Sequence, residues 1–324
     1  MSTRELAEGL HAVSLTGAPQ ELRDVGRRAL LWALASAVAA APREEVDLLV
    51  RHAQAVGATG PCSVPGRSER LDVQSAALVV GFAARLSAVG SRPVAPGGPG
   101  AVAVAAAVPL LARPGVGPDR LLDALVLGME AQLRVGLAMA PDHEERGWDS
   151  AGTVGPLGAA VTAGVLLGLD AGQLRHAVAI ATSTVLGHAE GFGTPLQAFH
   201  PGKAAANGLL AAFLAARGFT GADAALEGRR GYFHGIAPEA DVQALVRGLG
   251  TTWVLLGDTG LPGADQVRDS HVVRLEDPEL ERSAADLLDR TRPARGTNLV
   301  RTVTALPEQQ DCSSLLSATS PETT

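Results

Sequence analysis

The chain has 324 residues, of which 46% are hydrophobic and only 3% aromatic, and it carries a formal net charge of −7. This charge argues against a nucleic-acid or anionic-membrane surface, because both need clustered basic residues. With so few aromatic side chains, the core must consist of Ala, Leu and Val, and Ala and Leu favour helix over strand. We therefore predict a mostly helical globular protein.

The sequence also indicates a compartment. Its two cysteines, Cys62 and Cys312, form neither a CxxC motif nor a disulfide framework. The first residues, MSTRELAEGL, lack the basic-then-apolar pattern of a signal peptide. Apolar runs such as Ala29–Ala41 are shorter than the roughly 20 residues that span a bilayer. We expect a cytoplasmic protein with no membrane partner.

Apolar periodicity predicts most of the helices. In the first half we expect them at Pro19–Ala41, Pro42–Val56, Leu71–Ala88, Ala101–Leu111 and Pro118–Met139. In the second half we expect them at Thr153–Leu167, Ala171–Val185, Gly202–Arg217, Ala222–Glu227 and Pro238–Leu249. Several of these segments are apolar on every side, which is typical of fully buried helices. Residues 1–250 are therefore predicted to form one helical domain.

The sequence changes character after Gly250. TTWVLLGD is compatible with a short strand, and Pro278–Arg290 with a helix. We expect residues 251–306 to be a small C-terminal segment with one helix, and the polar residues 307–324 to be a disordered tail.

Four phrases in the middle of the chain carry a family resemblance. They are GWDSAGTVGPLGAA from Gly147, LLGLDAGQLRHAVAIA from Leu166, FHPGKAAANGLLAAFLAARGFTG from Phe199 and LEGRRGYF from Leu226. Together they resemble the MmgE/PrpD family, which includes 2-methylcitrate dehydratases and cis-aconitate decarboxylases. The resemblance implies a large helical domain, usually in a homodimer, that carries a smaller α/β lid. Here it implies an all-α protein whose lid is missing or vestigial.

The chain departs from the family at its acid–base positions. Asp149 stands where the family has a catalytic histidine, Ala151 where it has a threonine, and Gln197 where it has a lysine. The family's Asp-Phe-Asp-Asp-Thr-His run corresponds to Ser87–Arg92, which contains no carboxylate or histidine. Because these changes lower the positive charge that a tricarboxylate needs, we do not expect ordinary family chemistry.

The resemblance and the local patterns give seven candidate site residues. We assign catalysis to Asp149, His200 and Gln197, and substrate binding to His188, Lys203, Arg85 and Trp148. His188 and Gln197 are expected on a glycine-punctuated loop that ends at Pro201, since loops between rigid helices commonly carry function.

Purely structural roles compete with these assignments. Asp149 is equally suited to cap a helix N-terminus. His200 is suited to structural hydrogen bonding, Lys203 (the single lysine) to facing solvent, and Arg85 to covering apolar surface with its stem. His143 lies among acidic residues and is interpreted as part of a solvated charged turn.

The sequence lacks the motifs of metal and cofactor sites. HExxH, a dinucleotide-binding GxGxxG, a Walker sequence and a GxSxG elbow are all missing. We predict a metal-free, cofactor-independent enzyme that acts on a small molecule. Our first hypothesis is a cyclase or isomerase of a larger, mostly apolar biosynthetic intermediate, accelerated mainly by near-attack positioning. The alternatives are a dehydratase or decarboxylase with Asp149 as the base, and a non-catalytic binding relative.

Overall fold

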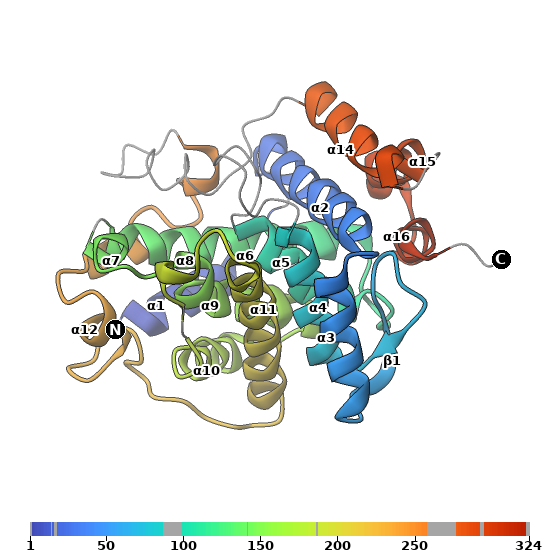
Figure 1. The fold of residues 1–324 in the computed structure, drawn as a ribbon. Helices are drawn as coiled ribbons and strands as arrows, with labels where there is room; N and C mark the ends of the chain where they lie inside the picture. The colour runs from blue at the N-terminus through green and yellow to red at the C-terminus, as the bar shows by residue number, and fades with distance from the viewer. Residues whose placement is uncertain are drawn as a thin grey trace.

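The computed structural model describes residues 2–13, 15, 18–86, 99–140, 142–185, 187–257, 277–291 and 295–321, and these form an all-α fold (Figure 1). The α-helices are α1 (Ser2–Ala12), α2 (Gln20–Ala40), α3 (Glu44–Ala55), α4 (Val73–Leu86), α5 (Pro99–Ala107), α6 (Pro118–Met139), α7 (Asp142–Glu145), α8 (Ser150–Thr153), α9 (Gly155–Leu167), α10 (Ala171–Ala181), α11 (Pro195–Ala216), α12 (Tyr232–Ile236), α14 (Asp277–Thr291), α15 (Arg295–Thr304) and α16 (Ser313–Thr319).

Short elements join these helices. A two-stranded antiparallel hairpin, β1 (Thr59–Ser63) with β2 (Arg70–Leu71), forms the sheet of the described residues. Single 3₁₀ turns occur at η1 (Val108–Leu110), η2 (Ala189–Gly191), η3 (Val242–Leu245), η4 (Val254–Leu256) and η5 (Leu306–Glu308). The predicted all-α fold class is confirmed. No described helix is long and apolar enough to cross a membrane.

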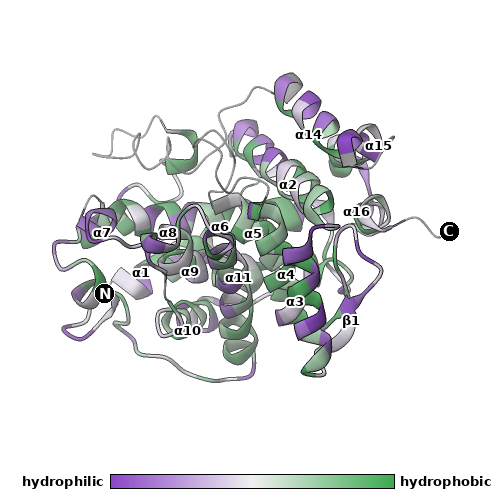
Figure 2. Cartoon of the chain, in the orientation of Figure 1, coloured by the Kyte–Doolittle hydropathy of each residue, from purple (hydrophilic) through white to green (hydrophobic). Residues whose placement is uncertain are grey.

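The centre of the molecule is a stack of helices built from small side chains. α11 packs against α4, α9 and α10, while α6 and α5 pack against α9. All residues of α9 except Val165 and Leu167 are buried, as expected for a helix that is apolar all round. Figure 2 shows hydrophobic residues concentrated on α4, α5 and α11 and hydrophilic residues on the outer helices α3, α14 and α15.

Glycines allow the central helices to touch along their backbones. A Cβ atom on Gly81 of α4 would lie 2.6 Å from the Cα of Gly202 on α11. A Cβ on Gly158 of α9 would lie 2.7 Å from the carbonyl oxygen of Gly128 on α6. Neither position has room for any larger residue, because protein interiors are close-packed. The high glycine content therefore sets the spacing of this core.

A fully buried ion pair on α6 fixes the segment that follows η3. The side chains of Glu130 and Arg134 are 0% exposed, and Arg134 Nε donates to Glu130 at 2.8 Å. The Glu130 carboxylate also accepts from the backbone N–H groups of Val254 and Leu255, at 3.0 and 3.1 Å. Arg134 donates in turn to the Thr252 carbonyl. The predicted strand at TTWVLLGD is wrong because these bonds hold its backbone in a 3₁₀ turn.

The C-terminal region is more ordered than its composition indicates. Beyond α14 the chain forms α15 and α16, rather than the single helix and disordered tail that we expected. Leu306, Cys312 and Leu315 are buried, and the N–H of Gly66 donates to the carbonyl of Thr319 at 2.7 Å. A few well-spaced apolar residues are thus enough to attach a polar segment to the domain.

Several predicted boundaries also differ from the structure. α11 begins at Pro195, not Gly202, because the Thr194 hydroxyl accepts from the N–H of Leu196 and caps the helix. Residues 222–227 form turns instead of a helix, and the predicted helix at 238–249 shortens to η3. α1 and the β1–β2 hairpin were not predicted. Residues 87–92, aligned with the family's acidic run, lie outside the described residues.

The α4–α11 crossing gives a stability prediction. Gly202→Ala should lower the free energy of unfolding by about 1–3 kcal/mol, because the added methyl overpacks a backbone contact. Gly136→Ala on α6 is the control, since nothing lies within 4 Å of its added Cβ. This change should stabilise the helix by about 0.5–1 kcal/mol. Urea unfolding of both variants makes the comparison, and equal midpoints would show that the crossing does not constrain the core.

Candidate functional site

Asp149 and His200 form a hydrogen-bonded pair at the centre of the candidate site. Asp149 precedes α8, and its Oδ1 accepts from the N–H of Ala151 at 3.1 Å. Its Oδ2 lies 2.5 Å from Nδ1 of His200, on α11. His200 is 5% exposed. The carboxylate therefore caps a helix, as one interpretation of the sequence has it, and also binds an imidazole.

A short two-strand contact holds Asp149 in place. The N–H of Asp149 donates to the Gly187 carbonyl at 3.0 Å, and the N–H of Ala189 donates to the Gly147 carbonyl at 2.7 Å. Trp148 and His188 are paired across this isolated antiparallel bridge. A Cβ on Gly187 would lie 2.9 Å from the Cα of Gly152, so the approach depends on glycine. Backbone pairing thus positions the carboxylate independently of its side-chain contacts.

Arg85 adds a cation to the pair. It lies on α4, one turn beyond Gly81, and its guanidinium is close enough to Asp149 for an electrostatic interaction. Burial lowers the pKa of Arg85 below its ordinary value, and the Asp149 carboxylate acts in the opposite direction. In the described part of the chain, Arg85 makes no hydrogen bond or ion pair. Asp149, just before α8, and His200 on α11 thus form a bonded pair, and Arg85 of α4 interacts electrostatically with Asp149 without bonding to it.

The other predicted site residues make no hydrogen bond to this cluster among the described residues. Gln197 and His200 belong to α11 rather than to a loop, which corrects the sequence interpretation. Gln197 accepts from the N–H of Gly193 at 3.2 Å, so it closes the first turn of α11. Lys203 and Trp148 are half-buried, and His188 is exposed. Among the described residues, no hydrogen bond joins any of these side chains to Asp149.

Pro201 lies inside α11, directly after His200. A proline has no N–H, so the helical hydrogen bond to the carbonyl of Gln197 cannot form. The helix continues because Thr194 and Pro195 start it cleanly and the surrounding helices pack it from several sides. The irregular turn of α11 therefore coincides with the turn that carries the imidazole.

Sequence reasoning was wrong about His143. It is 2% exposed rather than solvated, and its Nε2 lies 2.7 Å from the Thr153 hydroxyl. That hydroxyl donates to the Asp149 carbonyl at 2.9 Å, while the Tyr232 hydroxyl donates to the Thr153 carbonyl at 3.0 Å. His143 thus supports the turn that presents Asp149. The acidic neighbours of His143 concealed this, and no spacing signal in the sequence reveals it.

No group of His, Cys, Asp and Glu side chains in the described ranges is arranged to hold a metal ion. The chemistry that the cluster itself offers is proton transfer. One nitrogen of His200 is bound to a carboxylate, and a neighbouring guanidinium can stabilise developing negative charge.

The Asp149–His200 bond predicts a histidine tautomer. Because the carboxylate accepts from Nδ1, neutral His200 should carry its proton on Nδ1, and Asp149→Leu should shift the population toward the Nε2–H form. Nitrogen-15 chemical shifts of histidine-labelled protein distinguish the two forms. Asp170→Leu is the matched control, since Asp170 caps α10 through the N–H of Gln173 and does not contact His200. A wild-type His200 without a proton on Nδ1 would contradict this geometry.

The comparison with known families agrees with the geometry of the helical domain. The model of the MmgE/PrpD N-terminal domain matches residues 4–245, which include α4, α8 and α11 and every candidate site residue. A search of the curated proteins finds no match. The family match covers well over half of the chain, and on this evidence the chain belongs to the MmgE/PrpD family.

Proposed function

We propose that the protein is a cofactor-independent isomerase or cyclase that works by proton transfer at the Asp149–His200 pair. The observation that carries this proposal is the hydrogen bonding of the two nitrogens of the His200 imidazole. Nδ1 of His200 is bound to Asp149, whereas its Nε2 has no hydrogen-bond partner among the described residues. We further propose that the protein acts in the cytoplasm, as a homodimer, on a small-molecule substrate.

The proposed reaction begins at a carbon next to a carbonyl. Nε2 of His200 removes a proton from that carbon, and the electron pair of the C–H bond moves into an enolate whose negative oxygen faces Arg85. Asp149 orients the imidazole and stabilises the imidazolium that forms.

The imidazolium then returns the proton, which completes the reaction. In an isomerisation, the proton is delivered to a different carbon of the enolate system. In a cyclisation, the enolate carbon attacks an electrophilic carbon of the same molecule, and the proton goes to the new oxyanion. Atoms and electrons balance within the substrate in both cases, so no co-reactant is required.

Exposed apolar side chains support a substrate with a large nonpolar part. Phe192 and Leu196, which lie between His188 and Gln197 in the sequence, are 49% and 43% exposed. Contiguous apolar surface rimmed by polar groups marks ligand-binding sites, and we propose that these two side chains contact the nonpolar part of the substrate. A mostly apolar intermediate with one carbonyl or carboxylate group fits this combination.

The lyase alternative is favoured by one observation. Arg85 makes no hydrogen bond or ion pair among the described residues, and a guanidinium recognises a carboxylate through paired hydrogen bonds. If the substrate is a small carboxylic acid, the same proton removal would expel hydroxide, protonated by the imidazolium, as water. The two reactions differ in the mass change between substrate and product.

A metabolite comparison tests the proposal. A strain of the producing organism that lacks this gene should accumulate a compound with the same mass as the missing product. The wild-type gene should restore the product. His200→Ala should lower its formation by about 10²–10⁴-fold, the usual contribution of a general base. His52→Ala is the control, because His52 is exposed on α3.

The other outcomes identify the alternatives. If the accumulated precursor is heavier than the missing product by one water or one carbon dioxide, the protein is a lyase and not an isomerase. An unchanged profile, or full complementation by His200→Ala, would overturn the catalytic proposal and leave a binding protein.

A further inference from the structure

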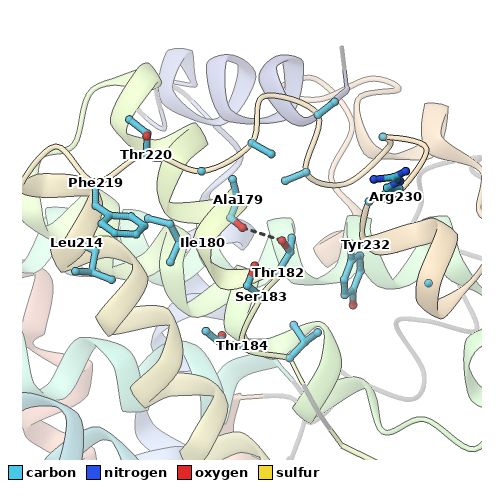
Figure 3. A pocket seen from close by; sticks show the side chains of 18 of the residues that line it. Ala179, Ile180, Thr182, Ser183, Thr184, Leu214, Phe219, Thr220, Arg230 and Tyr232 are labelled. Carbon is cyan, nitrogen blue, oxygen red and sulfur yellow. Dashed lines mark hydrogen bonds between the residues drawn. The ribbon is translucent and has the colours of Figure 1, made fainter.

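A separate cavity of about 870 Å³ is lined in part by the turn at residues 182–185 (Figure 3). Its walls are the end of α10, the second half of α11 and the segment 219–236. Asp149, His200 and Arg85 do not line it. The volume lies within the range of about 300–1,000 Å³ that is typical of small-molecule sites.

The two ends of this cavity differ in polarity. Ile180, Leu214 and Phe219 gather at one end, and Arg230 and Tyr232 lie at the other (Figure 3). Phe219 is 56% exposed, so the apolar end is accessible. Arg230 is also exposed, and among the described residues it makes no hydrogen bond or ion pair. The cavity thus has an apolar end and, at the opposite end, a guanidinium that makes no hydrogen bond or ion pair among the described residues.

Most other polar groups of the wall are already engaged. The hydroxyls of Thr182 and Thr184 donate to the carbonyls of Ala179 and Ala181, at 2.7 and 2.9 Å, and close the end of α10. The exposed Ser183 lies between them, and its hydroxyl has no partner among the described residues. Arg230, Ser183 and the exposed Thr220 are therefore the side chains of the wall that make no hydrogen bond among the described residues.

The outer wall of the cavity is held in place by specific bonds. The hydroxyl of Thr3 accepts from the N–H of Leu226 at 3.0 Å, and the N–H of Thr3 donates to Glu227 at 3.1 Å. The N–H of Gly221 donates to Nδ1 of His176 at 3.2 Å. α1 and α10 thus anchor the segment 219–236 from two directions. The cavity is part of the folded structure and exists before any ligand binds.

We propose that this cavity binds an amphipathic carboxylate, with its apolar tail between Ile180, Leu214 and Phe219 and its carboxylate on Arg230. The guanidinium matches a carboxylate in charge and in hydrogen-bond geometry. Burial of the tail supplies most of the binding free energy, in proportion to the apolar area removed from water. None of Asp149, His200 and Arg85 lines this cavity, so the second site does not use the groups of the proposed reaction, although Tyr232 of its wall also bonds to the turn that presents Asp149.

Isothermal titration calorimetry with decanoate tests the proposal on the full-length protein. Decanoate should bind, whereas acetate, which lacks the tail, should not. Decyltrimethylammonium has the same tail with the opposite charge and should bind at least tenfold more weakly. Arg230→Gln should weaken decanoate at least tenfold and remove the preference for the anion.

Two further variants locate the ligand. Arg229→Gln is the matched control, because Arg229 is an exposed neighbour that does not line the cavity, and it should leave the affinity unchanged. Ser183→Trp places a large side chain at an exposed position of the wall and should abolish binding.

The proposal is overturned if decanoate does not bind, or if both Arg230→Gln and Ser183→Trp bind it as tightly as the wild-type protein does. It is also overturned if His200→Ala abolishes decanoate binding while Ser183→Trp preserves it, since the ligand would then occupy the candidate catalytic site. Failure of the metabolite test for the isomerase leaves these binding results unaffected.

Discussion

The backbone contact between α4 and α11 is the constraint on which the candidate site depends. Gly81 and Gly202 touch at this crossing, so the two helices lie closer than any pair of larger residues would allow. Arg85 lies one turn beyond Gly81 on α4, and His200 lies two residues before Gly202 on α11. The close crossing therefore brings Arg85 near Asp149, the carboxylate that binds His200. In a core made of small residues, helix spacing rather than bulky side chains determines which polar groups meet.

The site uses Asp149 for two purposes at once. Its carboxylate caps α8 and also fixes one nitrogen of His200. The turn that presents it is held by backbone pairing with Gly187 and by the hydroxyl of Thr153, which in turn contacts the buried His143. A carboxylate restrained in this way loses little entropy when it orients an imidazole, and such preorganisation is what acid–base catalysis requires.

Elements that depend on a local sequence pattern could be predicted from the sequence. Features that depend on contacts between residues far apart in the chain could not. The helix Pro118–Met139 has the predicted bounds because a first-turn proline and regular apolar spacing define it. The start of α11 was misplaced because Pro201 was interpreted as a break, whereas tertiary packing keeps it inside the helix. The approach of Arg85 to Asp149 and the burial of His143 were beyond sequence reasoning, since both depend on how separate helices pack.

The central claim is that Nε2 of His200 exchanges a proton with a substrate held near Arg85. The most direct measurement is a crystal structure of the protein with the metabolite that accumulates when the gene is deleted. The account predicts a substrate carbon beside Nε2, with the carbonyl or carboxylate oxygen on the guanidinium of Arg85. A metabolite seated away from both groups, with Nε2 facing protein or solvent alone, would contradict it.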